Sequence, residues 1–252
     1  MSSVSVLMPW AGVCPHRRAA LAHVRAWYAE HHPDWDICIG DAREGADWCK
    51  AEAVRNALHW TSDDTDILVI ADADCIAVNI GDAVGAVRSG THNWAMPHQT
   101  VHRLNRIGTD LVMTQGADPA KLPRTSHYYA QMPYTGYAGG GIVVCKKNTY
   151  TECPLDPRFV GWGQEDESWA IALRCLFGPP WRPRHAPLWH LWHPPQQRSS
   201  RAVGSIQSRN LRTAYRRLSK SPDAMKQHIA PAKSYVQAAE KKLSSSSSTS
   251  RG

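Results

Sequence analysis

The chain has 252 residues, a formal net charge of +7 and seven cysteines. This length is enough to bury a full hydrophobic core in one large domain or two small ones. It contains no run of roughly 18 apolar residues, and its start, Met1-Ser2-Ser3-Val4, lacks the charged and apolar regions of a signal peptide. The cysteines include no C-x-x-C pair, which favours reduced thiols over a disulfide framework. We therefore expect a cytoplasmic protein without a transmembrane segment.

The first part of the chain alternates between strand and helix patterns. Short apolar runs predict strands, and apolar residues spaced three and four apart predict helices. The order is strand, helix, strand, helix, strand, at Val4–Met8, Arg17–Glu30, Asp36–Ile39, Asp47–Trp60 and Asp66–Ala71. Such an opening predicts a parallel sheet flanked by helices, so the expected fold class is α/β.

The pattern is less regular after the third strand. Gly81–Ser89 is compatible with a helix, Arg103–Gln115 is ambiguous, and Ile142–Cys145 predicts a strand. That strand follows Gly139-Gly140-Gly141, which closes the stretch from Tyr134. Three glycines permit close approach of the backbone to a ligand, but a plain turn explains them equally well.

The most informative motif is Asp72-Ala73-Asp74, which follows the apolar strand ending at Ala71. A chain of this length contains about one D-x-D by chance. A second copy, Asp64-Thr65-Asp66, precedes the same strand. Because open α/β sheets bind ligands at the carboxyl ends of their strands, position favours Asp72 and Asp74 as oxygen ligands for a cation and a phosphate.

A second cluster places three consecutive carboxylates before an apolar helical pattern, in Gly161-Trp162-Gly163-Gln164-Glu165-Asp166-Glu167. Carboxylates in the first turn of a helix are favourable against its dipole, so a structural cap is one interpretation. The flanking glycines and Trp162 favour a second interpretation, in which this segment forms the wall of a pocket with an acid at the bottom. Such a carboxylate can act as a general base if it reaches an acceptor hydroxyl.

A third cluster is Trp189-His190-Leu191-Trp192-His193-Pro194. Pro194 argues against a continuing helix, so the pattern favours one histidine over two at a given metal ion. A hydrogen-bonded core histidine is the structural alternative. Together with Asp74, an imidazole would form a mixed oxygen and nitrogen site, which suits Mn²⁺ and other first-row ions.

The positive charge belongs to the C-terminal part of the chain. Residues 198–252 contain 12 Lys and Arg and two acidic residues and carry +10, so residues 1–197 carry −3. The segment near Ser205–Ser219 predicts a helix with an apolar face and an arginine face, formed by Leu211, Tyr215 and Leu218 and by Arg209, Arg212 and Arg216. The arginine face is either the solvated side of a docked helix or a patch for phosphate, nucleic acid or an acidic surface.

These patterns predict three segments of the chain. Residues 1–197 form the main domain, residues 198–243 a basic helical extension, and residues 244–252 a disordered, serine-rich tail that cannot form a core.

In their order along the chain, these motifs resemble a GT-A glycosyltransferase. The W-G-x-E-D element is similar to that of the galactosyltransferase C-terminal domain and of chondroitin-polymerase-like enzymes. The resemblance spans residues 4 to 195 and rests on Met8-Pro9-Trp10, Asp41, Lys50, Asn56, Asp72-x-Asp74, Gly139-Gly140-Gly141, Gly161-Trp162-Gly163-x-Glu165-Asp166 and His193. It implies a Rossmann-like GT-A fold with a mixed, mainly parallel central sheet flanked by helices.

The resemblance also implies an activity, the metal-dependent transfer of a sugar from a nucleotide sugar to an acceptor hydroxyl. The expected donor is a UDP-sugar. The metal, Mn²⁺ or Mg²⁺, would bind Asp74 and His193. Asp72 would approach this metal or the donor ribose, and His190 lies where some relatives have a second ligand.

The remaining roles implied by the resemblance concern the base and the pocket. Asp166 would be the catalytic base, with Glu165 and Trp162 shaping the acceptor and donor-sugar pocket. Other implied residues line the donor site, at Pro9, Arg18, Asp41, Lys50 and Asn56, or the acceptor site, at Gly140 and Gly141. Gln164 departs from the family, which often has glycine there, so the resemblance does not fix the shape of the sugar or acceptor pocket.

A base of this kind implies single displacement with inversion at the anomeric carbon. The acceptor could be a glycan, a protein side chain or a modified nucleic-acid base. Two other functions stay open. A nucleotidyltransferase or other sugar-nucleotide-processing enzyme would also use an acidic pair and a metal, and a non-catalytic module would bind nucleic acid or glycan.

Overall fold

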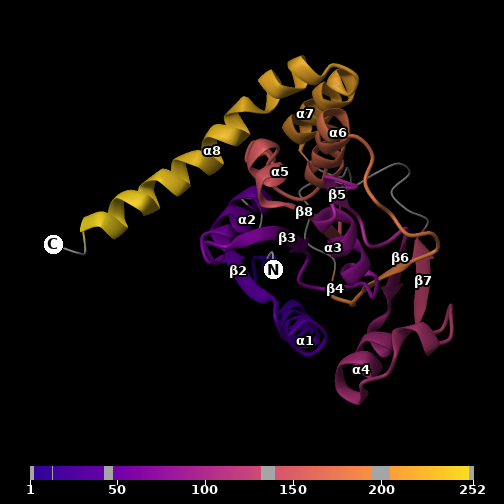
Figure 1. Cartoon of the computed structure of the whole chain (residues 1–252). Helices are drawn as coiled ribbons and strands as arrows, with labels where there is room; N and C mark the ends of the chain where they lie inside the picture. The colour runs from indigo at the N-terminus through magenta and orange to yellow at the C-terminus, as the bar shows by residue number, and fades with distance from the viewer. Residues whose placement is uncertain (1–2, 13, 43–47, 132–139, 195–204, 250–252) are drawn as a thin grey trace.

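The computed structural model describes residues 3–12, 14–42, 48–131, 140–194 and 205–249. Its centre is a five-stranded sheet of order β2-β1-β3-β8-β5 (Figure 1). These strands are β1 (Ser3–Trp10), β2 (Asp36–Asp41), β3 (Thr65–Ala71), β5 (Trp94–Ala95) and β8 (Ile142–Lys146). β1 is parallel to β2 and β3, and β8 is antiparallel to β3 and β5. Only β8 is reversed, which confirms the expected α/β class with a mixed, mainly parallel sheet.

Alternating side chains give the sheet two apolar faces. In β1, Val6 and Met8 belong to one core, and Leu7 belongs to the other. The first core is covered by α1 (Pro15–His31) and α3 (Ile80–Arg88). The second is covered by α2 (Lys50–Leu58), α5 (Lys147–Glu152) and α6 (Glu165–Phe177). The sheet therefore lies between two helical layers.

A smaller sheet of order β4-β9-β6-β7 adjoins the end of β3. Its strands are β4 (Cys75–Ile76), β6 (Thr100–Leu104), β7 (Tyr128–Gln131) and β9 (Pro187–His190). β4 begins directly after Asp74 and pairs antiparallel with β9, with Cys75 opposite His190. This pairing brings the histidine cluster, His190 and His193, to the acidic motif Asp72-Ala73-Asp74.

The ambiguous segment Arg103–Gln115 divides into two elements. β6 ends at Leu104, and α4 (Arg106–Gln115) follows it, with a short 3₁₀ helix (Pro119–Lys121) beyond. Asn105 sets the turn between β6 and α4, and its side-chain oxygen accepts a hydrogen bond of 2.9 Å from Gly108 N.

Most expected elements have boundaries that differ from the sequence pattern by a few residues. α1 begins at Pro15, two residues before Arg17, because proline suits the first position of a helix. α2 begins at Lys50, whereas the pattern placed the start at Asp47, which lies outside the described residues. Residues 134–139 of the glycine-rich stretch also lie outside them.

Two C-terminal helices pack on the second core. They are α7 (Ile206–Leu218) and α8 (Pro222–Thr249), and they bury Tyr215, Met225, Ile229 and Val236 there. α8 then extends away from the rest of the chain (Figure 1) and includes serines that the sequence pattern placed in a tail. The division at residue 197 stays a prediction, because residues 195–204 are not described.

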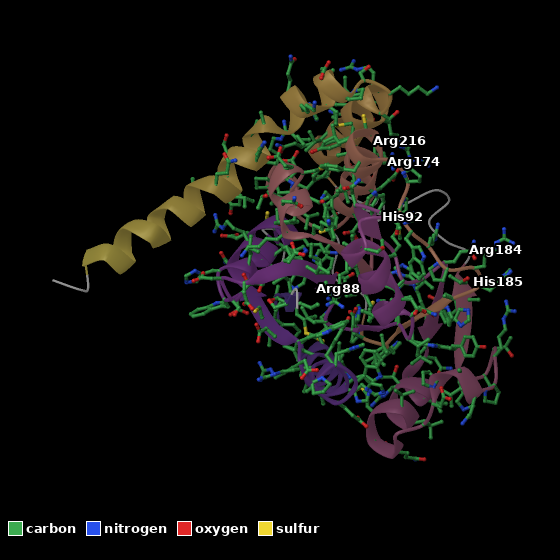
Figure 2. The ribbon with its side chains drawn as sticks, in the orientation of Figure 1. Arg88, His92, Arg174, Arg184, His185 and Arg216 are labelled. Carbon is green, nitrogen blue, oxygen red and sulfur yellow. The ribbon has the colours of Figure 1, made fainter. Side chains whose placement is uncertain are left out.

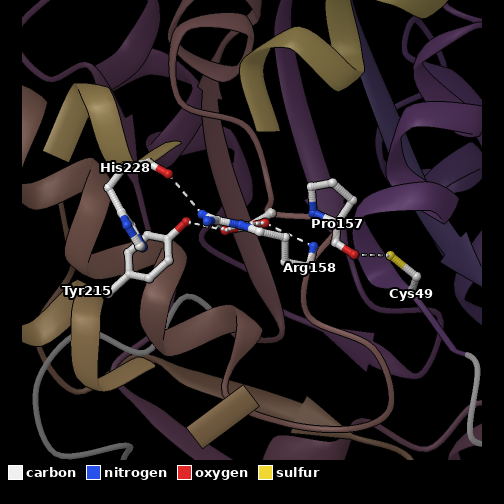
Figure 3. A network of polar contacts seen from close by, with 6 residues as sticks. Cys49, Pro157, Arg158, Tyr215 and His228 are labelled. Carbon is white, nitrogen blue, oxygen red and sulfur yellow. Dashed lines mark hydrogen bonds and ion pairs between the residues drawn. The ribbon is translucent and has the colours of Figure 1, made fainter. Parts of the chain in front are cut away.

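A polar network ties these two helices to the loop before α6 (Figure 3). Asp156 is buried and accepts hydrogen bonds from Arg158 Nε at 2.9 Å and from Tyr215 OH at 2.8 Å. Arg158 also donates to the carbonyl of His228 on α8 at 2.9 Å. The loop, α7 and α8 therefore share one buried ion pair.

In the described residues, no helix combines the length and the apolar character that a membrane crossing requires. The seven cysteines are free thiols. Cys38, Cys75 and Cys145 are buried in the cores, and Cys175 is partly exposed.

The network around Asp156 makes a prediction about stability. The Asp156 side chain is 3% exposed, so Arg158→Leu would leave a buried carboxylate without its cation. We expect this substitution to lower the free energy of unfolding by about 3 kcal/mol in urea denaturation. Lys121→Leu is the matched control, because it removes the exposed Asp118–Lys121 pair. It should cost about 0.5 kcal/mol. Similar losses for both variants would contradict this role of Arg158.

Candidate active site

A cavity of about 950 Å³ lies at the carboxyl ends of β1 and β3. It is lined by the end of β1, the start of α2, the acidic motif after β3, the start of α6 and the histidine cluster after β9. Arg216 of α7 also lines it. Segments from most of the chain therefore meet where open α/β sheets bind their ligands.

Lys50 connects two carboxylates from different elements of this cavity. Its Nζ lies 2.7 Å from Asp72 Oδ1 and 2.8 Å from Asp166 Oδ1. Burial lowers the pKa of Lys50, but Asp166 and Asp72 outweigh it and raise this pKa well above its ordinary value. Lys50 is thus a permanent cation that holds the acidic motif against the start of α6.

Asp72 is fixed from its other side by Gly141. The Asp72 amide donates to Gly141 O at 2.8 Å, and the Gly141 amide donates to Asp72 Oδ2 at 3.1 Å. Gly141 has φ +86°, and a Cβ there would lie 2.4 Å from Leu188 Cδ2. Glycine suits both the positive φ and the lack of room for a Cβ. Gly141 therefore lets the backbone hold Asp72 of the acidic motif in place.

The carboxylates of the second cluster occupy the first turn of α6. Gln164 precedes them with φ +82°, in the region that favours glycine. Burial raises the pKa of Glu165 and of Asp166. The negative charge of Asp166 raises the pKa of Glu165 further. Lys50 donates a hydrogen bond to Asp166 and opposes the rise in the Asp166 pKa, so it favours the ionised form of Asp166, whereas burial and the Asp166 charge favour the protonated form of Glu165.

The Glu165 side chain also has an unused oxygen. Glu165 is 8% exposed, and its Oε2 has no hydrogen-bond partner among the described residues. A buried polar atom without a partner is uncommon in a folded protein. Since Glu165 lines the cavity, a bound ligand can supply this partner.

The third cluster faces Asp74. His193 Nε2 lies 3.1 Å from Asp74 Oδ2, and His190 Nε2 lies 3.8 Å from Asp74 Oδ1. The His193 Nδ1 is 2.8 Å from the carbonyl of Pro194. A carbonyl only accepts, so Nδ1 carries the hydrogen and the Nε2 lone pair of neutral His193 points at the carboxylate. Two lone pairs at this distance repel unless a proton or a metal ion lies between them.

The chemistry of these groups fits a divalent metal. Burial would raise the pKa of Asp74, but His190, His193 and Arg17 outweigh it and hold this pKa well below its usual range. Burial lowers the pKa of His190, which favours the neutral, ligating imidazole. A carboxylate with imidazoles suits Mn²⁺ and similar ions, and a backbone carbonyl on the second ring nitrogen is typical of ligating histidines.

Cys75 lies beside this group but has a different role. Ligand atoms of Asp74, Cys75 and His190 lie within 4.8 Å of one another. Burial raises the pKa of Cys75 well above its ordinary value, so the thiol keeps its proton. Its Sγ donates to Asp74 Oδ1 at 3.3 Å, and Cys75 therefore orients the carboxylate.

One wall of the cavity is aromatic. Trp162 stacks on Trp48, with ring centroids 5.3 Å apart, and the Arg17 guanidinium lies 4.7 Å from the Trp162 ring centroid. The Gly161 amide donates to the Trp48 carbonyl at 2.8 Å, which joins the acidic cluster to the residues before α2. The wall offers flat apolar surface beside a cation.

The structure brings most of the expected site residues to this cavity. Those that line it are Pro9, Lys50, Asp72, Asp74, Gly141, Trp162, Glu165, Asp166, His190 and His193. Four others are not part of the described lining, namely Arg18, Asp41, Asn56 and Gly140. The roles of all these residues toward a donor, an acceptor or a metal stay predictions.

The four residues outside the lining have other surroundings. Asn56 Nδ2 donates to the Asp41 carbonyl at 2.7 Å, which joins α2 to β2, and Gly140 is buried. Arg18 is exposed on α1, and its neighbour Arg17 lines the cavity instead. Consecutive helix residues point about 100° apart, so only one of the two faces the site.

Several lining residues were missed in the sequence. They include Trp10, Arg17, Trp48, Arg103, Tyr129, Trp192 and Arg216. Eleven tryptophans beside two phenylalanines were a signal for an aromatic wall, although it did not point to Trp10 or Trp48. No local pattern distinguished Arg17 or Arg103, whereas Arg216 belonged to the predicted arginine face.

No protein-family model matches this sequence, and neither does any curated protein. Among solved structures, the chain is similar to the catalytic domain of Drosophila β1,4-galactosyltransferase 7 in complex with xylobiose. The identity is 15%, over 83% of this chain and 79% of that one, with a TM-score of 0.47. It is also similar to glucosyl-3-phosphoglycerate synthase from Mycobacterium tuberculosis with Mg²⁺ and UDP, at 15% identity over 85% and 79% of the chains and a TM-score of 0.42.

A third similar structure is the mannosyltransferase PcManGT from Pyrobaculum calidifontis with GDP-Man and Mn²⁺. The identity is 16%, over 93% of this chain and 68% of that chain, with a TM-score of 0.42. At these values the likeness does not identify a reaction.

The facing arrangement of Asp74 and His193 predicts metal binding. We expect the protein to bind one Mn²⁺ in isothermal titration calorimetry. Asp74→Asn and His193→Ala should each weaken this binding by at least about tenfold, because each removes a ligand. His59→Ala, at an exposed histidine after α2, is the control and should bind like wild type. If His193→Ala also bound like wild type, a proton rather than a metal would join the two side chains.

Proposed function

We propose that the protein is a metal-dependent glycosyltransferase that moves a sugar from a nucleotide sugar, with a UDP-sugar as donor, to an acceptor hydroxyl. One observation carries the proposal. The Asp74–His193 pair, which fits a divalent cation, and the Lys50-bound carboxylate Asp166, which fits a base, line the same cavity. A metal-dependent single displacement from a nucleotide diphosphate uses both kinds of group.

The donor end of the cavity lies at Asp74. A divalent cation held by Asp74, His193 and His190 would stabilise the negative charge of a diphosphate leaving group. Arg17 and Arg103 line the same cavity, and Arg17 is close enough to lower the pKa of Asp74. Their charges complement a diphosphate, and the stacked tryptophans provide a flat surface for a ring of the donor.

The acceptor end lies at the start of α6. Asp166 accepts the proton of the acceptor hydroxyl as the oxygen attacks the anomeric carbon. Lys50 favours the ionised form of Asp166 before this step and remains beside the carboxyl group after it. Glu165, with its unpaired Oε2, hydrogen-bonds a hydroxyl of the donor sugar or the acceptor.

The reaction is expected to invert the anomeric configuration. Asp166 serves as a base for the acceptor, so attack and departure of the diphosphate occur in one displacement on opposite faces of the sugar.

This proposal is tested with a panel of nucleotide sugars and acceptors. We expect mass spectrometry to show a glycosylated product that requires Mn²⁺. Asp166→Asn should lower kcat by about 10²–10⁴-fold, because it removes the base. Asp64→Asn changes the exposed second D-x-D and should retain the wild-type rate.

Two outcomes would contradict the proposal. Consumption of nucleoside triphosphates in place of nucleotide sugars would indicate a nucleotidyltransferase. Unchanged transfer by Asp166→Asn would remove the assigned base. NMR of the fresh product tests the stereochemistry, and a retained anomeric configuration would exclude single displacement.

A further inference from the structure

The segment after the acidic cluster Glu165-Asp166-Glu167 has an unusual charge pattern. Residues 168–222 contain ten Lys and Arg and no Asp or Glu, although the chain has 22 acidic residues. Among the described residues, this segment comprises most of α6, the loop to β9, β9 itself and α7. A long run without a single carboxylate, next to the cavity, indicates an anionic partner rather than a balanced solvated surface.

The positive charge begins at the rim of the cavity. Arg216 lines the cavity and donates through Nε to Glu167 Oε1 at 2.8 Å. Arg212 donates to the other oxygen of Glu167 at 3.3 Å. Two guanidinium groups on one carboxylate leave a net positive charge there. Arg216 is 55% exposed, so it can contact an incoming anion.

The charge continues along α6 away from the cavity. Arg174 lies seven positions after Glu167, which places it about 10 Å further along the same helix face. Asn93 Nδ2 donates to the carbonyl of Phe177, the last residue of α6, so the neighbouring His92 lies near the end of the helix. Figure 2 shows Arg216, Arg174 and His92 in succession on one side of the molecule, with Arg184 and His185 on the loop beyond.

The far end of this series contains a hollow of about 380 Å³. It is lined by His92, Trp181 and Arg184 among others, and Trp181 is partly exposed. Proteins that bind single-stranded nucleic acid combine a line of cations for the backbone with aromatic rings on which bases stack. We call the three arginines Arg216, Arg174 and Arg184, together with His92 and Trp181, the cationic track.

We infer that the cationic track binds single-stranded nucleic acid and leads it to the cavity, so that the acceptor hydroxyl belongs to a nucleic acid. This inference rests on the proposed function, because it takes the cavity as the place of sugar transfer. A line of cations that joins a deep cavity to a hollow with an aromatic ring matches a polymer of phosphates. An anionic membrane would instead favour a flat surface with exposed apolar anchors.

The test measures binding of a fluorescein-labelled oligothymidylate by fluorescence anisotropy, with saturating UDP and Mn²⁺ to fill the donor end. We expect binding by the full chain that weakens steeply as salt rises. Arg216→Gln and Arg184→Gln should each weaken it about fivefold and reduce the salt slope by about 1. Arg217→Gln is the matched control, since it removes the same charge from the next, exposed position of α7.

Three results would overturn the inference. They are no binding of the oligonucleotide, equal losses for Arg217→Gln and Arg216→Gln, and displacement of the oligonucleotide by vesicles of anionic phospholipid that bind through the same two arginines. Turnover of nucleotide sugar by the wild-type chain reports on the proposed function separately. Oligonucleotide binding without turnover would refute that function and leave only nucleic-acid binding by the track. Turnover without this binding would refute the track and leave the proposed function standing.

Discussion

The contact on which the site depends is the buried cation of Lys50 between Asp72 and Asp166. It joins the end of β3, the start of α2 and the start of α6, and Lys50 and Asp166 are 116 positions apart in the chain. A buried ammonium without partners would lose its charge, and two adjacent carboxylates without a cation would repel each other. The two carboxylates therefore hold the positive charge of Lys50, and Lys50 offsets the repulsion between them. The same contact places Asp166, the proposed base, next to the motif that faces the candidate metal ligands.

The C-terminal helices hold this arrangement from outside. Asp156 and Arg158 fix the loop before α6 to α7 and α8, while Arg212 and Arg216 hold Glu167 in the first turn of α6. The basic extension thus does more than cover an apolar face, since one of its arginines reaches the rim of the cavity. This joins two features that the sequence presented separately, the acidic cluster and the positively charged C-terminal region.

The order of strands and helices and the place of Asp72 and Asp74 could be predicted, because both follow from local periodicity and from where a strand ends. The convergence of His190 and His193 on Asp74 depends on the pairing of β4 with β9, a contact between residues more than 110 positions apart that no local pattern encodes. The choice of Arg17 over Arg18 depends on the rotation of α1. Gln164 shows that a position typical of glycine can hold another residue, with its backbone at φ +82°.

The proposed reaction depends most on one metal ion at the donor end of the cavity, which we expect Asp74 and His193 to hold. Crystals grown with Mn²⁺ and UDP, measured at the manganese absorption edge, test it directly. We expect a single anomalous peak in the cavity, about 2.0–2.2 Å from an oxygen of Asp74 and from His193 Nε2, with the diphosphate against it. A cavity that contains UDP but no peak between these two side chains, or a peak on other residues, would contradict the account.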